Sequence, residues 1–171
     1  MKVSHFAFAA LLCMPVLTFA HEGHKAAEPP AGFDKMKSLV GTWEGTVNME
    51  GKDIPTKTVF EVTSGGSVIT EKMAPGTEHE MINMYHADGK RLSMTHYCAA
   101  GNQPHMMLKK SDDKSLAFEM EKPIGVDNMK MDHMHGVTYT MVDANTLEAK
   151  WMNMENGKMK GPTVFKYKRV K

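Results

Sequence analysis

The sequence predicts an all-β protein whose strands form one antiparallel, closed or nearly closed barrel, with a single short helix at one end. Three observations support this prediction. From residue 42 onwards, segments rich in Val, Ile, Thr, Tyr, Phe and Met alternate with turn signals, about every eight to twelve residues. Within these segments apolar and polar side chains alternate with the period of two that is typical of a strand. No long helical pattern follows any strand, which argues against a parallel sheet of βαβ units.

Residues 1–20 have the three parts of a secretory signal peptide: a basic start, an apolar run and small residues before a cleavage site after Ala20. The apolar run is too short to span a bilayer as a permanent helix. We therefore expect a periplasmic or secreted protein whose mature chain begins at or near His21. A flexible, polar leader at 21–31 then precedes a single barrel domain at 32–171.

Beyond the signal segment the charges balance, with 20 basic and 20 acidic side chains. Such a balance provides no attraction to nucleic acid, and no later apolar run is long enough to span a membrane. Cys98 is the only cysteine of the mature chain, so no intrachain disulfide is expected. Methionine is unusually frequent, with 16 of 18 residues beyond the signal segment, and thioethers both fill protein cores and bind Cu(I).

A short helix is expected at residues 34–39, because Phe33, Met36 and Val40 share one face at helical spacing and Gly41 can end it. Eleven strand-like segments follow, one of which we expect to be a loop. They lie at residues 42–49, 56–63, 67–73, 79–86, 91–98, 105–110, 115–121, 129–134, 137–142, 146–152 and 162–169. An antiparallel sheet of this size has to close or stack to protect its edges, which favours a barrel of about ten strands.

Two residues at opposite ends of the chain are expected to close the barrel. Trp43 lies on the apolar face of the first strand. Arg169 lies with Phe165 and Tyr167 on the inward face of the last strand, where a charge is costly unless it is satisfied. We predict that Trp43 offers Arg169 the face of its ring at the closed end of the barrel.

The segment LVGTWEG (39–45) resembles the opening of lipocalin-like (calycin) barrels, in which G-x-W follows a short helix and the tryptophan meets a late-strand arginine. The segments MYHADG (84–89) and THYCAAGNQP (95–104) are similar to a family of uncharacterised exported bacterial proteins. This likeness extends from about Phe33 to the C-terminus. The chain departs from that family in its many methionines and in His105, where a basic residue is expected. Because the family has no assigned reaction, the resemblance implies a lipocalin-like barrel and export rather than an activity.

The dipeptide Asp88-Gly89 is a signal for a two-residue hairpin turn, which predicts that Met81 lies opposite His96 and His79 opposite Cys98. The face that carries these pairs is expected to point inward. The candidate ligand-binding residues on it are His79, Met81, Tyr85, Met94, His96 and Cys98. Three interpretations remain open for this face: a filled core with a hydrogen-bonded His96, a pocket for a small molecule, and a metal site.

Two further clusters contain candidate metal ligands. The first comprises Met129, Met131, His133 and His135. These residues would share one face of an extended segment, where thioether and imidazole suit Cu(I); alternatively the methionines line the barrel and one histidine faces solvent. The second cluster is His21 and His24 at the mature N-terminus, where an amine and imidazoles could hold Cu(II) or simply be solvated.

Motifs of common enzymes are absent: the sequence contains no G-x-S-x-G, P-loop, Rossmann glycine pattern or H-E-x-x-H. We therefore assign no catalytic residue. The interpretation that the sequence favours is an exported barrel that binds a small apolar or partly polar molecule in its interior. The alternatives are a periplasmic protein that binds copper or another soft metal through its Met/His clusters, and a Cys98-dependent enzyme.

Overall fold

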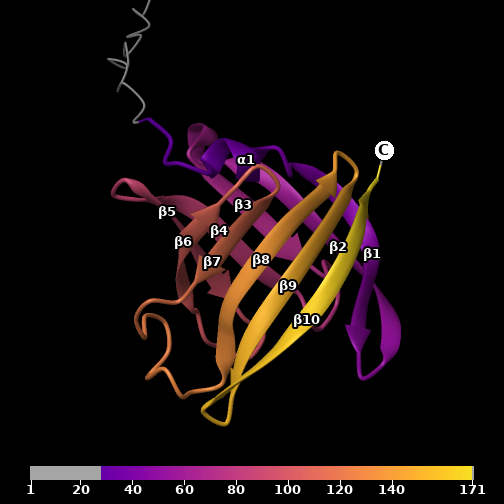
Figure 1. Cartoon of the computed structure of the whole chain (residues 1–171), viewed down its shortest axis with the longest axis vertical. Coiled ribbons are helices and arrows are strands. Elements are labelled where there is room, and N and C mark those ends of the chain that lie inside the picture. The colour runs from indigo at the N-terminus through magenta and orange to yellow at the C-terminus, as the bar shows by residue number, and fades with distance from the viewer. Residues whose placement is uncertain (1–27, 171) are drawn as a thin grey trace, which may run out of the picture.

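The computed structural model describes residues 28–170, and in them the chain forms one short α-helix and ten strands (Figure 1). Residues 1–20, most of the leader, and with them His21 and His24, lie outside the described residues. Helix α1 spans Phe33–Lys37, and a 3-10 turn, η1, spans Ser64–Gly66. The strands are β1 (Gly41–Met49), β2 (Lys52–Thr63), β3 (Val68–Met73), β4 (Met81–Asp88), β5 (Arg91–Tyr97), β6 (His105–Ser111), β7 (Ser115–Glu119), β8 (His133–Asp143), β9 (Thr146–Glu155) and β10 (Lys158–Arg169).

The ten strands form one closed antiparallel barrel, which confirms the predicted fold class. Each strand pairs with the next along the chain, and β10 returns to pair with β1. Helix α1 lies over one end of the barrel, and the β1–β2 and β9–β10 hairpins lie at the other end (Figure 1). Phe33 and Met36 of α1 are buried against the core and fill that first end. The opposite end, which we call the mouth, has no such cover in the described chain.

Trp43 and Arg169 are direct neighbours across the β1–β10 seam, as predicted. The guanidinium carbon of Arg169 lies 4.1 Å from the centroid of the Trp43 ring, which is a cation–π distance. Arg169 also donates hydrogen bonds to the carbonyl oxygens of Ser38 and Val40, at 2.9 and 2.7 Å. Trp43 donates from its indole nitrogen to the carbonyl oxygen of Leu39 at 2.8 Å. This pair therefore ties the last strand to the first strand and to the segment after α1.

The same seam requires a glycine at position 45. A Cβ atom placed on Gly45 would overlap the carbonyl oxygen of Lys166 in β10. Because only glycine lacks that atom, this position allows β1 and β10 to approach each other and complete the ladder.

Several elements differ in their bounds from the predicted ranges: β2 and β10, for example, each begin four residues earlier than expected. Helix α1 ends at Lys37, two residues earlier than expected, and no helix of the described chain is long and apolar enough to cross a membrane. The predicted strand at 129–134 is mostly loop, so it is the loop expected among the eleven segments. Here the side-chain oxygen of Asn128 accepts hydrogen bonds from the backbone nitrogens of Lys130 and Met131, at 2.9 and 3.2 Å, which holds a turn instead of a strand.

The predicted register of the β4–β5 hairpin is wrong by one pair of residues. Asp88 pairs with Arg91, so the two-residue loop is Gly89-Lys90 rather than Asp88-Gly89. Gly89 has a φ of 59°, whereas Asp88 keeps an extended conformation, which fits a turn with glycine in its first loop position. A shift of a whole pair keeps every side chain on its predicted face but changes its partner. His96 consequently lies opposite Asn83 instead of Met81.

Candidate ligand-binding site

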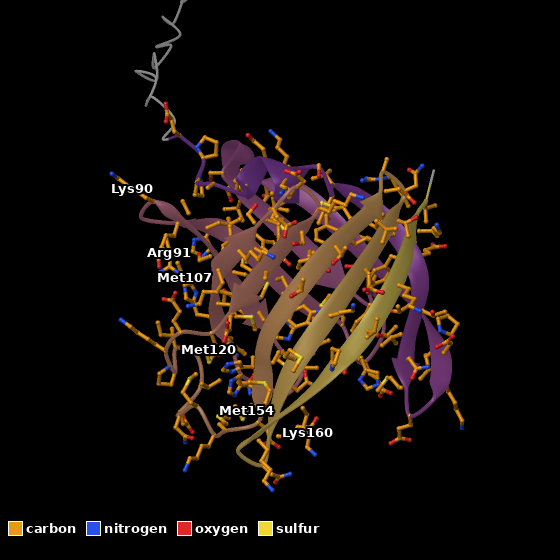
Figure 2. The ribbon with its side chains drawn as sticks, in the orientation of Figure 1. Lys90, Arg91, Met107, Met120, Met154 and Lys160 are labelled. Carbon is orange, nitrogen blue, oxygen red and sulfur yellow. The ribbon has the colours of Figure 1, made fainter. Side chains whose placement is uncertain are left out.

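A pocket of about 580 Å³ opens at the mouth of the barrel. We call it the mouth pocket. Met154 and Lys160, which flank the β9–β10 hairpin, mark this end of the molecule in Figure 2. The apolar side chains that line the pocket are Val47, Met49, Ile54, Met73, Met81, Met134 and Phe165. Thr56, Thr77, Thr163 and Asn153 add polar atoms, and His79 is the only ionisable side chain among the lining residues described.

Two of the predicted ligand-binding residues line the mouth pocket. The side chain of Met81 is half-buried in its wall and faces Met73 directly across the β3–β4 ladder. His79 lies in the loop before β4 and 78% of its side chain is exposed, so it stands at the rim. The four thioethers of the pocket, from Met49, Met73, Met81 and Met134, provide a flexible and polarisable surface that adapts to ligand shape.

Deeper in the barrel, the carboxyl group of Glu71 is buried and takes part in four hydrogen bonds. Its Oε1 accepts from the hydroxyl of Thr58 at 3.0 Å. Its Oε2 lies 2.6 Å from Asn83 Nδ2, 2.7 Å from the Tyr85 hydroxyl and 2.6 Å from the Tyr139 hydroxyl. Burial raises the pKa of Glu71, and the hydrogen bonds from these neighbours only partly oppose that effect.

The hydrogen bonds among Glu71, Tyr85 and Tyr139 indicate that Glu71 is a neutral acid. The two tyrosine hydroxyls also lie 2.7 Å from each other, so three oxygens form a triangle with three short edges. Each edge needs one proton, and the two tyrosines supply two because burial raises the pKa of both hydroxyls. A proton on Glu71 provides the third. No buried Lys or Arg accompanies this carboxyl group in the described chain, and an uncompensated buried carboxylate would be costly.

His96 is linked to this network through Asn83. Asn83 directs its Nδ2 to Glu71, so its carbonyl oxygen faces His96 Nδ1 at 2.6 Å. A carbonyl only accepts, and therefore Nδ1 of His96 carries the proton. Burial lowers the pKa of His96 to about 4, so the ring is neutral at pH 7. Its Nε2 then holds a buried lone pair, for which the described residues offer no donor in hydrogen-bond geometry.

The remaining predicted ligand-binding residues do not reach the mouth pocket. Tyr85 belongs to the Glu71 network and Met94 is fully buried in the core. Cys98 lies half-buried in the loop after β5, where its sulfur accepts a hydrogen bond from the backbone nitrogen of Ala100 at 3.5 Å. The predicted pairing of His79 with Cys98 is wrong, since the β4–β5 ladder stops at Ile82 and Tyr97. His79 is therefore not placed across from Cys98, where it could have acted as a base for a Cys98 nucleophile.

The predicted Met/His cluster is brought together only in part. His133 Nε2 lies 3.0 Å from His135 Nδ1, and both rings are buried near the mouth end of β8. Met154, which the sequence analysis did not single out, lies opposite His133 in the β8–β9 ladder. Met129 and Met131 pack against the core from the preceding loop, so the prediction that they share a strand face with the histidines is wrong.

The residue that sequence reasoning missed is Glu71. It alternates with Ile69 and Met73, and this period of two places all three side chains on the inward face of β3. The pattern was therefore sufficient to find a buried carboxyl group, although not its four partners. Those partners come from β2, β4 and β8, which only the folded barrel brings together.

Searches with the sequence against protein-family models and against curated proteins find no match.

Proposed function

We propose that this protein is an exported, lipocalin-like barrel that binds a small, largely apolar molecule in its mouth pocket. The observation that carries the proposal is the mouth pocket itself, an apolar concavity of about 580 Å³ at an end of the barrel that α1 leaves open. Sites for small molecules in proteins have volumes of roughly 300–1,000 Å³ and apolar walls with a few polar groups. The signal-peptide pattern of residues 1–20 and the similarity of THYCAAGNQP (95–104) to exported bacterial proteins support the cellular location.

Binding of N-phenyl-1-naphthylamine tests this proposal, because the fluorescence of this neutral dye rises in an apolar site. We expect saturable binding by the wild-type protein and a loss of at least about tenfold in affinity in Met49→Lys, which puts a charge into the pocket. Val142→Lys is the matched control. Met49 and Val142 are both 53% exposed, but Val142 lies at the end of β8 that is remote from the mouth. Equal loss in the two variants, or no binding by the wild type, contradicts the proposal.

A second candidate function is binding of a soft metal ion at His133 and His135. The observation that favours it is the separation of 3.0 Å between their facing ring nitrogens. The two nitrogens share a hydrogen bond in the structure, and one ion bound at about 2.0–2.1 Å from each nitrogen would take the place of the shared proton. No group of three or more His, Cys, Asp or Glu side chains suited to a metal occurs in residues 28–170. Thioethers, of which Met154 is the ladder neighbour of His133, would complete the ligand set, and they select Cu(I).

Competition between the protein and a Cu(I) chelator tests this candidate. We expect the wild-type protein to retain Cu(I), and both His133→Gln and Met154→Leu to release it at lower chelator concentration. Met159→Leu is the control for Met154→Leu, since it removes an exposed thioether from the same hairpin. If Met159→Leu weakens retention as much as Met154→Leu, or if the wild type retains no Cu(I), this second candidate is rejected.

A further inference from the structure

Within residues 28–170, three buried polar atoms without a hydrogen-bond partner belong to neighbouring residues at or beyond the lining of the mouth pocket. They are Nε2 of His96, Nε1 of Trp151 and Oδ1 of Asn153. The rings of His96 and Trp151 are in contact, with 5.1 Å between their centroids. Asn153 follows Trp151 by two residues on the same face of β9, one step nearer the mouth, where it lines the pocket. Buried polar atoms in folded proteins are almost always paired, so this grouping calls for a physical explanation.

The chemistry of these atoms is defined by their surroundings. His96 Nε2 is an acceptor, because Asn83 holds the proton of the ring on Nδ1. Trp151 Nε1 can only donate, and the amide oxygen of Asn153 accepts. The group thus offers two acceptors and one donor, of which Asn153 lines the otherwise apolar pocket and His96 and Trp151 lie buried beyond its lining. A hydroxyl or an N–H group of a ligand could donate to one acceptor, and a hydroxyl oxygen could also accept from the indole.

The same surroundings disfavour an anion. No Lys or Arg lines the mouth pocket, and none is buried in the described chain. His96 stays neutral at pH 7 because burial lowers its pKa, and the nearest buried acid is Glu71. A carboxylate placed here would meet two lone pairs and a single donor, without a counter-charge to replace its hydration.

We propose that the mouth pocket selects neutral apolar molecules that carry a hydroxyl or N–H group, and that this group enters first and pairs with His96, Trp151 and Asn153. This inference rests on the proposed function and specifies the class of ligand. The four thioethers and Phe165 contact the apolar remainder of the molecule, while anionic amphiphiles such as fatty acids are excluded from the inner end.

The test compares 1-decanol with decanoate as competitors for N-phenyl-1-naphthylamine at pH 7.5, at total concentrations below those at which decanoate forms micelles. The two molecules have the same chain length and differ only in the leading group. We expect 1-decanol to displace the dye at a concentration at least about tenfold lower than decanoate, since each unpaired buried polar group is costly. Trp151→Phe and Asn153→Leu remove the partners and should reduce this preference, which is measured for each variant as the ratio of the decanoate and 1-decanol concentrations that displace half of its own bound dye.

Tryptophan emission supplies an independent readout, because the chain contains only two tryptophans and Trp43 lies at the opposite end of the barrel, under Arg169. In Trp43→Phe, 1-decanol should shift the emission of Trp151. If the dye binds and Met49→Lys weakens it, but decanoate competes as well as 1-decanol, the ligand class is wrong while the proposed function stands. If Trp151→Phe and Asn153→Leu prefer 1-decanol over decanoate as strongly as the wild type does, the proposed pairing of the ligand hydroxyl with these residues is wrong. Absence of dye binding contradicts the proposed function itself.

Discussion

Arg169 places its guanidinium carbon 4.1 Å from the ring centroid of Trp43 and donates to the carbonyl oxygens of both Ser38 and Val40. One side chain of the last strand thereby satisfies acceptors in the segment after α1 and covers the largest aromatic ring of the first strand. Because the charge is spread over a ring face and three carbonyl oxygens, the third being that of Ala144 at 3.3 Å, the cost of half-burying it is compensated. Arg169 thus ties the last strand to the helix end of the barrel, which Phe33 and Met36 of α1 fill.

Arg169→Ala should therefore lower the free energy of unfolding by about 2–4 kcal/mol, from loss of the cation–π contact and of the hydrogen bonds to three carbonyl oxygens. Urea denaturation followed by tryptophan fluorescence measures the loss. Lys168→Ala, on the neighbouring exposed position, should change stability by less than about 0.5 kcal/mol. Comparable effects of the two substitutions would show that the contact with Trp43 is not a major source of stability.

Gly45→Ala should be far more destabilising than Gly89→Ala. The Cβ of an alanine at position 45 overlaps the carbonyl oxygen of Lys166, so the β1–β10 ladder has to separate, at a cost above about 3 kcal/mol. At Gly89 a Cβ meets nothing within 4 Å, and only the φ of 59° opposes it, at about 1–2 kcal/mol. Thermal denaturation of the two variants decides the order, and the reverse order would refute the close approach at Gly45.

Replacement of Glu71 should reveal how much its four hydrogen bonds contribute to the stability of the fold. Glu71→Leu leaves the polar groups of Thr58, Asn83, Tyr85 and Tyr139 without their hydrogen-bond partner and should cost about 3 kcal/mol or more, whereas Glu71→Gln keeps an acceptor oxygen and a donor and costs less. Because the folded state raises the pKa of Glu71, it holds a proton that the unfolded chain releases above about pH 4.5. Wild-type stability should therefore decline relative to Glu71→Gln as pH rises above 4.5. Urea denaturation of both proteins between pH 4 and 8 measures this, and a constant difference would mean that Glu71 is ionised in the fold.

His96 should contribute the opposite dependence on pH. Its pKa is lowered from 6.5 to about 4, so between these values the unfolded chain binds a proton that folded His96 does not bind. Wild-type stability should thus fall relative to His96→Gln as pH decreases from 6.5 to 4, by up to about 3 kcal/mol. Denaturation curves of both proteins at several pH values give the difference, in which the other titrating groups cancel. A wild-type stability that stays constant or rises relative to His96→Gln as pH decreases from 6.5 to 4 would overturn the assignment of a neutral His96.

The sequence was informative wherever one side chain or one local period decides the structure. Alternation along each strand predicted the inward face that holds Met81, Tyr85, Met94 and His96, and the positions of Trp43 and Arg169 predicted their contact. The hairpin partner of His96 was not predictable in the same way. Asp88-Gly89 and Gly89-Lys90 are both acceptable two-residue loops, and the choice between them depends on how β4 and β5 pack against the rest of the barrel.

The interior network could not be derived from local pattern because its members are far apart in the chain. Glu71 and Tyr139 are separated by 68 positions, and neither position has a sequence signal that points to the other. The prediction of a strand for the Met129–Met131 segment was wrong for a different reason. Its alternation of apolar and charged residues suits a strand, but the side chain of Asn128 captures the following backbone and makes a turn.

The β1–β10 seam also determines when this molecule can finish folding. Val40 and Arg169, which meet there, are 129 positions apart, so a growing chain cannot make the contact until β10 has been synthesised. Bringing such distant segments together carries a large loop-closure entropy, and barrels closed by distant contacts fold slowly. Until the 12 residues of β10 are in place, β1 and β9 each present an open edge to which another chain can add. A truncation that removes β10 would leave those two edges exposed permanently and should yield aggregates rather than a smaller barrel.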